Sequence, residues 1–152
     1  MTTTLKQRLH DDLTAAMKSR DELRSATIRL TLSAITNEEV AGTTARQLSD
    51  DEVLKVIGRE AKKRREAAEA FAQGGRAESA QRERAEGEVL AEYLPTQLTD
   101  EELTQLVRSA IAESGAEGPR AMGAVMKVVN PRVAGLAEGG RVAAEVKRQL
   151  AG

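Results

Sequence analysis

The chain has 152 residues, with 40% hydrophobic, 31% charged and 1% aromatic residues, and a net charge of -1 at pH 7. This charge excludes a protein that binds nucleic acid mainly by non-specific attraction to phosphate, so any RNA contact has to be local. With no cysteine and one histidine, we expect no disulfide, thiolate metal site, cysteine nucleophile or bound cofactor. No apolar run reaches the roughly 18 residues of a membrane span, and no basic-then-apolar leader opens the chain, which predicts a cytoplasmic protein with no membrane contact.

Two helices are predicted at the start of the chain. Apolar residues recur at helical spacing after Thr4, which can cap the first helix. Asp21 can cap a second helix that ends near Gly42. Two apolar stripes run along this second helix, one through Leu30, so we expect it to lie at the centre of the N-terminal part. Glu38 follows the Leu30 stripe inward.

The next two helices are predicted to form an antiparallel hairpin. Ser49 and Glu52 have the spacing of a capping box, followed by a long helix to about Gln73. Gly74-Gly75 ends that helix and turns the chain into a fourth, from Arg76 to Tyr93.

Arg64 lies on the apolar face of the third helix, where an unpaired charge would cost several kcal/mol to desolvate. In a hairpin that turns at Gly74-Gly75, Glu86 lies opposite Arg64 and on the inward side of the fourth helix. We therefore predict a largely buried ion pair between Arg64 and Glu86 that sets the hairpin's register. Glu38 is the alternative partner.

Strong helix-stop and helix-start signals meet around Pro95, which cannot continue a helix and is followed by a capping box at Thr99 and Glu102. This junction predicts two domains, residues 1–95 and 96–152. The single tyrosine, Tyr93, lies beside the junction, and we expect its ring to hold the two halves together with its hydroxyl at a wet edge.

Three shorter helices are predicted after the junction. The first starts at Thr99 and stops at Gly115. The second starts at Pro119 and is ended by Asn130-Pro131. Gly135 to Gly140 is a predicted loop, and Val142, Val146 and Leu150 define the last helix. No segment alternates with period two, so the predicted fold is all-α: a four-helix N-terminal part and a smaller three-helix C-terminal domain.

A basic stripe on the third helix is the first candidate functional feature. It comprises Lys55, Arg59, Lys62 and Lys63, and RNA contacts would have this form. The alternative is a solvated helix face on which Glu60, Glu66 and Glu69 neutralise the cations. No aromatic residue lies nearby to stack on bases, which argues against sequence-specific recognition of single strands.

Other candidate chemistry has simpler explanations. The acids at 50–52 and 100–102 lie in first helical turns, where they suit the helix dipole and caps. His10 has no serine, cysteine or second histidine near it in the sequence to form a catalytic relay, so it is expected at the surface. No phosphate-binding glycine loop is present, and we predict no catalytic residue and no metal site.

Three segments, at 60–66 (EAKKRRE), 92–98 (EYLPTQL) and 122–126 (MGAVM), in this order and spacing, resemble the YqeY-like proteins of the GatB/YqeY family. The likeness covers nearly the whole chain. It implies that residues 99–150 are similar to the tail domain of the B subunit of aspartyl/glutamyl-tRNA amidotransferase, a domain that helps to engage tRNA. It also implies a family-level label of carbon-nitrogen ligase with glutamine as amido-N-donor, although no residue here is suited to that reaction.

Family members usually carry Lys-Gly-Arg-Ala-Asp-Gly-Lys where this chain has Ala134 to Gly140, without the basic residues. The loss leaves Lys127, Arg132 and Arg141, with the helix-three stripe, as candidate RNA contacts. The resemblance therefore implies a non-catalytic, tRNA-associated accessory module, whose partners are tRNA or a protein of the tRNA-charging or amidation machinery. The alternatives are a helical protein-interaction module with no nucleic-acid partner and, less consistent with the residues, a stand-alone amide-transfer enzyme.

Overall fold

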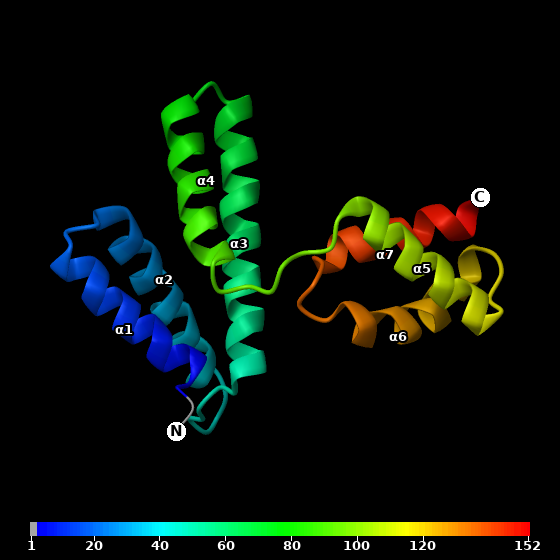
Figure 1. The fold of residues 1–152 in the computed structure, drawn as a ribbon, viewed down its shortest axis with the longest axis horizontal. Coiled ribbons are helices and arrows are strands. Elements are labelled where there is room, and N and C mark those ends of the chain that lie inside the picture. Colours follow the sequence, from blue (N-terminus) through cyan, green and yellow to red (C-terminus); the bar gives the residue numbers. More distant parts are fainter. Residues whose placement is uncertain (1–2) are drawn as a thin grey trace. The chain divides into compact units, whose positions relative to one another are not determined.

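The computed structural model describes residues 3–152, which are all-helical, with no strand in that range (Figure 1). The chain divides into two compact units, one ending at Leu94 and one beginning at Pro95. The first unit contains α1 (Leu5–Lys18), α2 (Glu22–Glu39), α3 (Asp50–Gln73) and α4 (Ala77–Ala91). The second contains α5 (Asp100–Ser114), a short 3-10 helix (Pro119–Ala121), α6 (Met122–Val133) and α7 (Gly139–Ala151). Whether 1–95 and 96–152 fold as separate domains stays a prediction.

Local capping chemistry explains where four of the helices begin. The side chains of Thr4 and Asp21 accept hydrogen bonds from amides in the first turns of α1 and α2. Ser49 and Thr99 each form the predicted capping box, with the glutamate three residues on accepting from the cap residue's own amide. These bonds involve near neighbours in the sequence, which is why the starts of these helices could be predicted.

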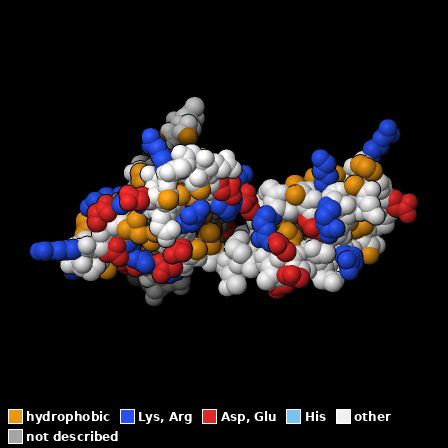
Figure 2. Space-filling model, turned by 90° about the horizontal axis from the view of Figure 1, so that it is seen from above, with side chains coloured by type: hydrophobic (Ala, Val, Ile, Leu, Met, Phe, Trp, Pro, Cys, Tyr) orange, Lys and Arg blue, Asp and Glu red, His pale blue; other side chains and the backbone are white. Residues whose placement is uncertain are grey.

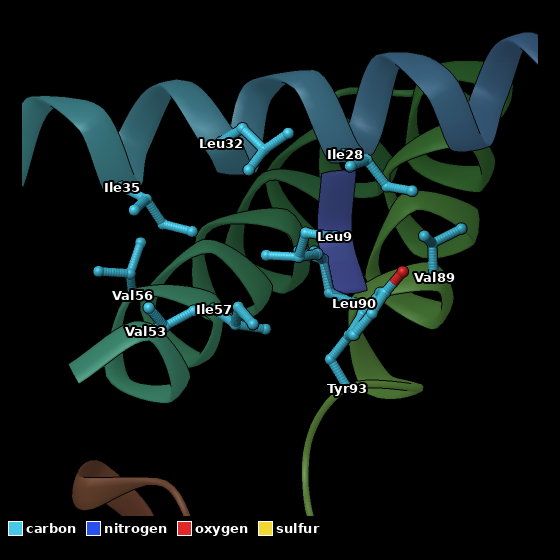
Figure 3. Packing of buried hydrophobic residues seen from close by; sticks show 10 residues of the cluster. All are labelled: Leu9, Ile28, Leu32, Ile35, Val53, Val56, Ile57, Val89, Leu90 and Tyr93. Atoms are coloured by element: carbon cyan, nitrogen blue, oxygen red, sulfur yellow. The ribbon is translucent and has the colours of Figure 1, made fainter. Parts of the chain in front are cut away.

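The core of the first unit joins all four of its helices (Figure 3). Its buried members are Leu9, Ile28, Leu32, Ile35, Val53, Val56, Ile57, Val89, Leu90 and Tyr93. α2 contributes one continuous face to this core, and its buried Thr27 and Thr31 hydroxyls donate to carbonyls one turn back in the same helix. The predicted stripe through Leu30 is wrong at that residue, which is half exposed, because α2 is covered on fewer sides than its composition suggested.

The α3–α4 hairpin extends past the ends of α1 and α2 in Figure 1. Residues 62–88 of this hairpin, hereafter the arm, lie beyond its last core members, Ala61 and Val89. Buried Ala68 and Ala80 are the small residues that allow its helices to approach closely. Gly75 makes the turn at φ 77°, a conformation that suits glycine.

Arg64 lies inside this hairpin, where three carboxylates surround its guanidinium group. The shortest nitrogen–oxygen distances are 3.3 Å to Glu86, 3.5 Å to Glu60 and 3.7 Å to Glu83. The Arg64 side chain is 19% exposed and that of Glu86 is 8% exposed. The alternative partner, Glu38, pairs instead with Arg59. The expectation that Glu60 lies on a solvated face is wrong, because its carboxylate turns inward to Arg64.

The second unit is a three-helix bundle around a separate core. Its buried members are Leu103, Val107, Ala110, Val125, Val129, Val133, Val142, Val146 and Leu150. The residues that enter this unit are held to the loop before α7: the Leu98 amide donates to the Leu136 carbonyl (2.8 Å), and the Gln97 side chain donates to the Gly135 carbonyl (2.9 Å). This loop therefore has a structural role.

Two predicted boundaries in the second unit differ from the structure. α6 continues through Pro131 to Val133. Proline removes one backbone hydrogen bond, which the last turn tolerates because it also buries Val133 in the core. α7 begins at Gly139, inside the predicted loop, because the Glu138 carbonyl already accepts from the Val142 amide.

The Arg64 cluster yields a stability prediction. We expect Arg64→Met to lower the free energy of unfolding by about 3–5 kcal/mol, because it leaves the carboxylate of Glu83 without a cation and those of Glu60 and Glu86 with only the exposed cations Lys63 and Arg82. Arg65→Met, one position along the same helix but on its exposed side, is the matched control and should change the value by less than about 0.5 kcal/mol. Urea unfolding followed by circular dichroism measures both, and equal stabilities for the two variants would contradict the prediction.

Candidate nucleic-acid interface

The predicted basic stripe lies along the exposed face of α3, and three of its four cations face carboxylates. The pairs are Arg59 with Glu38 (3.4 Å), Lys62 with Glu66 (3.9 Å) and Lys63 with Glu60 (2.9 Å). Lys55 is exposed and has no carboxylate partner among residues 3–152. Figure 2 accordingly shows basic and acidic side chains interspersed over the first unit. Exposed ion pairs contribute about 0–1 kcal/mol each, so they lower the local potential without preventing exchange for a phosphate.

The three candidates in the second unit have different surroundings. Arg141 donates to Asp100 (2.9 Å) and to the carbonyl of Leu98 (3.1 Å), so it ties the start of α7 to the start of α5. Arg132 forms an ion pair with Glu113. Lys127 is exposed and has no acidic partner in the described part of the chain. Lys127 is therefore the candidate in this unit with the most available charge.

Three further cations of the second unit were not among the candidates from the sequence. Arg108 on α5, Arg120 in the 3-10 helix and Lys147 on α7 are exposed, and the described residues provide no carboxylate for them. On the face seen in Figure 2, the basic side chains of this unit are separate from one another. A helical wheel could have found them, because each lies away from the buried positions of its element.

A pocket of about 370 Å³ in the first unit lies between α1, the start of α2 and the end of α4. The Arg8 guanidinium lies over the ring of Tyr93, 4.7 Å from its centroid, and the Tyr93 hydroxyl donates to Asp12. Arg24 forms an ion pair with Glu92 across the pocket (2.8 Å). The expectation that Tyr93 holds the two halves together is wrong, because its ring lies in the core of the first unit.

Tyr93 is also the most strongly perturbed acid of this pocket. Burial, followed by the hydrogen bond to Asp12, raises the pKa of Tyr93 well above its usual range. The hydroxyl therefore stays protonated and acts as a structural donor, not as a base.

The acid that turns inward at the end of α2 is Glu39, not the predicted Glu38. Glu39 is 8% exposed and accepts from Lys6 (2.8 and 3.1 Å) and from the Leu48 amide (3.2 Å). These bonds, led by the one from Lys6, lower the pKa of Glu39. The prediction was one residue out because it followed the stripe through Leu30, which is half exposed, whereas Glu39 continues the buried face of Ile28, Leu32 and Ile35 at helical spacing.

Two further acids, Glu52 and Glu102, are used by helix starts. Glu52 and Glu102 accept from the amides of Ser49 and Thr99, and in Glu102 this bond is the main cause of a lowered pKa. Within residues 3–152 no group of three histidine, cysteine or acidic side chains could hold a metal ion. His10 is exposed. No helix in the same range has the length and apolar composition needed to cross a membrane.

Comparison with known proteins identifies the family. A family model described as Yqey-like protein matches residues 6–150. The chain belongs to the YqeY-like family. It is also 32% identical, over 127 residues, to "Altered inheritance of mitochondria protein 41, mitochondrial" of Clavispora lusitaniae (strain ATCC 42720). That match covers 81% of this chain and 72% of the relative.

The segments that carry the YqeY resemblance have structural roles in this chain. Residues 60–66 hold the centre of the Arg64 cluster, 92–98 include Tyr93 and the entry into the second unit, and 122–126 form the first turns of α6. The three segments that carry the family resemblance therefore build the scaffold of this chain. Most of its exposed cations lie outside these segments.

The single tyrosine allows the pocket to be tested directly. We expect Tyr93 to ionise well above the ordinary pH of about 10 in the folded protein, and Asp12→Asn to lower its pKa because the carboxylate that disfavours the phenolate is removed. Since the chain has no tryptophan and no other tyrosine, near-ultraviolet absorbance reports this phenolate alone. A titration at the ordinary pH in the unmodified protein would contradict the observed burial. Asp11→Asn, at the neighbouring exposed position, is the control.

Proposed function

We propose that this YqeY-like protein is a non-catalytic, tRNA-associated accessory module, in which residues 99–150 act like the tail domain of the amidotransferase B subunit. The observation that carries the proposal is the surface of the second unit, which presents Lys127 without a carboxylate partner in the described residues. Arg108, Arg120 and Lys147 share this property. Lysine and arginine side chains in this state are available for phosphate oxygens without first breaking an ion pair.

The proposal also accounts for the lack of a catalytic arrangement among the described residues. The three carboxylates around Arg64, that of Glu39 beside Lys6 and those of Glu52 and Glu102 at helix caps have structural partners. The one tyrosine is held protonated. A binding role requires only the unpaired surface cations described above. The carbon-nitrogen ligase label would then apply to a larger machinery with which the module associates. Its location in the cytoplasm remains a prediction.

A second candidate function is a helical protein-interaction module without a nucleic-acid partner. It is favoured by the pairing of Arg59, Lys62 and Lys63 with carboxylates, because a neutralised stripe attracts RNA less strongly. Met17, Leu30 and Val40 are also exposed on the first unit. Single exposed apolar residues are common in soluble proteins, so this support is weaker.

Filter binding to tRNA tests the proposal. With about three phosphate contacts from the second unit alone, we expect the affinity to fall at least about 20-fold between 50 and 150 mM salt. Lys127→Glu should weaken binding, whereas Lys18→Glu, an exposed lysine of α1 that also lacks a carboxylate partner in the described residues, is the matched control. Equal affinity for tRNA and an unrelated DNA duplex, or no binding at low salt, would contradict the proposal and favour the protein-interaction alternative.

A further inference from the structure

The arm separates its charges between interior and exterior, although its sequence is nearly neutral. The carboxylates of Glu83 and Glu86 in the arm, and of Glu60 just before it, are 20%, 8% and 10% exposed, and all three face Arg64. One interior cation therefore faces three interior anions, of which Glu60 and Glu86 also pair with the exterior cations Lys63 and Arg82. The exterior must then carry relatively more positive charge than the sequence suggests.

The exposed charges of the arm confirm this imbalance. Six exposed residues are basic: Lys62, Lys63, Arg65, Arg76, Arg82 and Arg84. Four exposed residues are acidic: Glu66, Glu69, Glu78 and Glu88. Arg76 and Arg84 have no carboxylate partner in the described part of the chain, and Arg82 is the rim cation that links Glu86 to Glu22 at the start of α2.

The shape of the arm suits a partner with regularly spaced negative charge. Its α3 half, residues 62–73, is 12 residues long, which corresponds to about 18 Å of helix. The chain's two aromatic residues are Phe71 and Tyr93, and neither is fully exposed. The arm therefore has no fully exposed aromatic side chain on which unpaired bases could stack. Its basic side chains can still contact the phosphates of a double-helical backbone.

We propose that the exterior of the arm binds the phosphate backbone of double-helical RNA, without reading its bases. This inference rests on the proposed function and adds a second contact surface to it, on the first unit and distinct from Lys127. The interior carboxylates act indirectly: they stay between the two helices with Arg64, Lys63 and Arg82 as partners, and leave Arg76 and Arg84 as the arm cations with no carboxylate partner in the described residues. A duplex stem, not a single-stranded loop, is the part of a folded RNA that such a surface recognises.

Pairs of variants with equal changes in net charge test this inference. Arg76→Gln with Arg84→Gln should reduce the salt slope of tRNA binding by about two. Lys18→Gln with Arg20→Gln, at exposed positions near the end of α1, should leave the slope unchanged. Glu78→Gln, on the exterior, should strengthen binding about threefold, the effect of one unit charge at about 6 Å in water. Glu83→Gln, in the interior, should not strengthen it.

The outcomes separate this inference from the proposed function. If the Arg76/Arg84 variant binds tRNA like the unmodified protein while Lys127→Glu binds more weakly, the arm inference is wrong and the proposed function stands. If the unmodified protein does not bind tRNA at low salt, the proposed function fails. If the arm variant loses binding to a single-stranded RNA as much as to a duplex stem, or polyglutamate binds as tightly as tRNA, the assignment to double-helical RNA is overturned. Unchanged circular dichroism of each variant shows that it is folded.

Discussion

The ion cluster around Arg64 is the interaction on which the first unit depends. It lies in the hairpin of α3 and α4, and its three carboxylates come from both helices. Burying such charges is costly, so the cluster adds little net stability compared with apolar packing, but removing one partner is strongly destabilising. A slide of one helix turn would replace Glu86 opposite Arg64 by Arg82 and Glu83 in one direction, or by Val89 and Leu90 in the other. The cluster therefore sets the register of a hairpin whose distal half has little apolar core beyond Ala68 and Ala80.

The same cluster connects the fold with the surface charge. The carboxylates of Glu60, Glu83 and Glu86 lie mostly in the interior of the hairpin. A protein of net charge -1 can therefore have locally basic surfaces. In the second unit less positive charge is left unpaired at the surface, because Arg132 and Arg141 form ion pairs there. Lys127 has no acidic partner in the described residues. RNA contact through such surfaces would be weak and sensitive to salt.

Features decided by near neighbours could be predicted from the sequence. The caps at Thr4, Asp21, Ser49 and Thr99 depend on residues within one helical turn, and the hairpin at Gly75 depends on local backbone freedom. The facing positions of Arg64 and Glu86 followed from the turn and the helical repeat. Family membership followed from the order of three short segments and is shown by the match over residues 6–150.

Features decided by tertiary packing could not be predicted in the same way. The stripe through Leu30 placed Glu38 inward, but the face of α2 that is buried is that of Ile35, one turn before Glu39, and Glu39 meets Lys6. Tyr93 was assigned between the halves, yet Asp12, 81 positions earlier in the sequence, accepts its hydroxyl. The charge partners of the basic stripe also come from side-chain placement, since Lys63 and Arg64 both reach Glu60. These side-chain partners depend on which helices become neighbours in the fold, and a single sequence does not reveal that.

A double-mutant cycle on Arg64 and Glu86 tests the central claim most directly. The single variants Arg64→Met and Glu86→Gln and the double variant are unfolded in urea, and the coupling free energy is taken from the four stabilities. The account predicts a favourable coupling of about 1–3 kcal/mol, because the two side chains interact in a mostly buried site. A coupling near zero would show that the pair does not interact in solution, and would contradict both the assigned register and the partition of charge between the interior and the exterior of the arm.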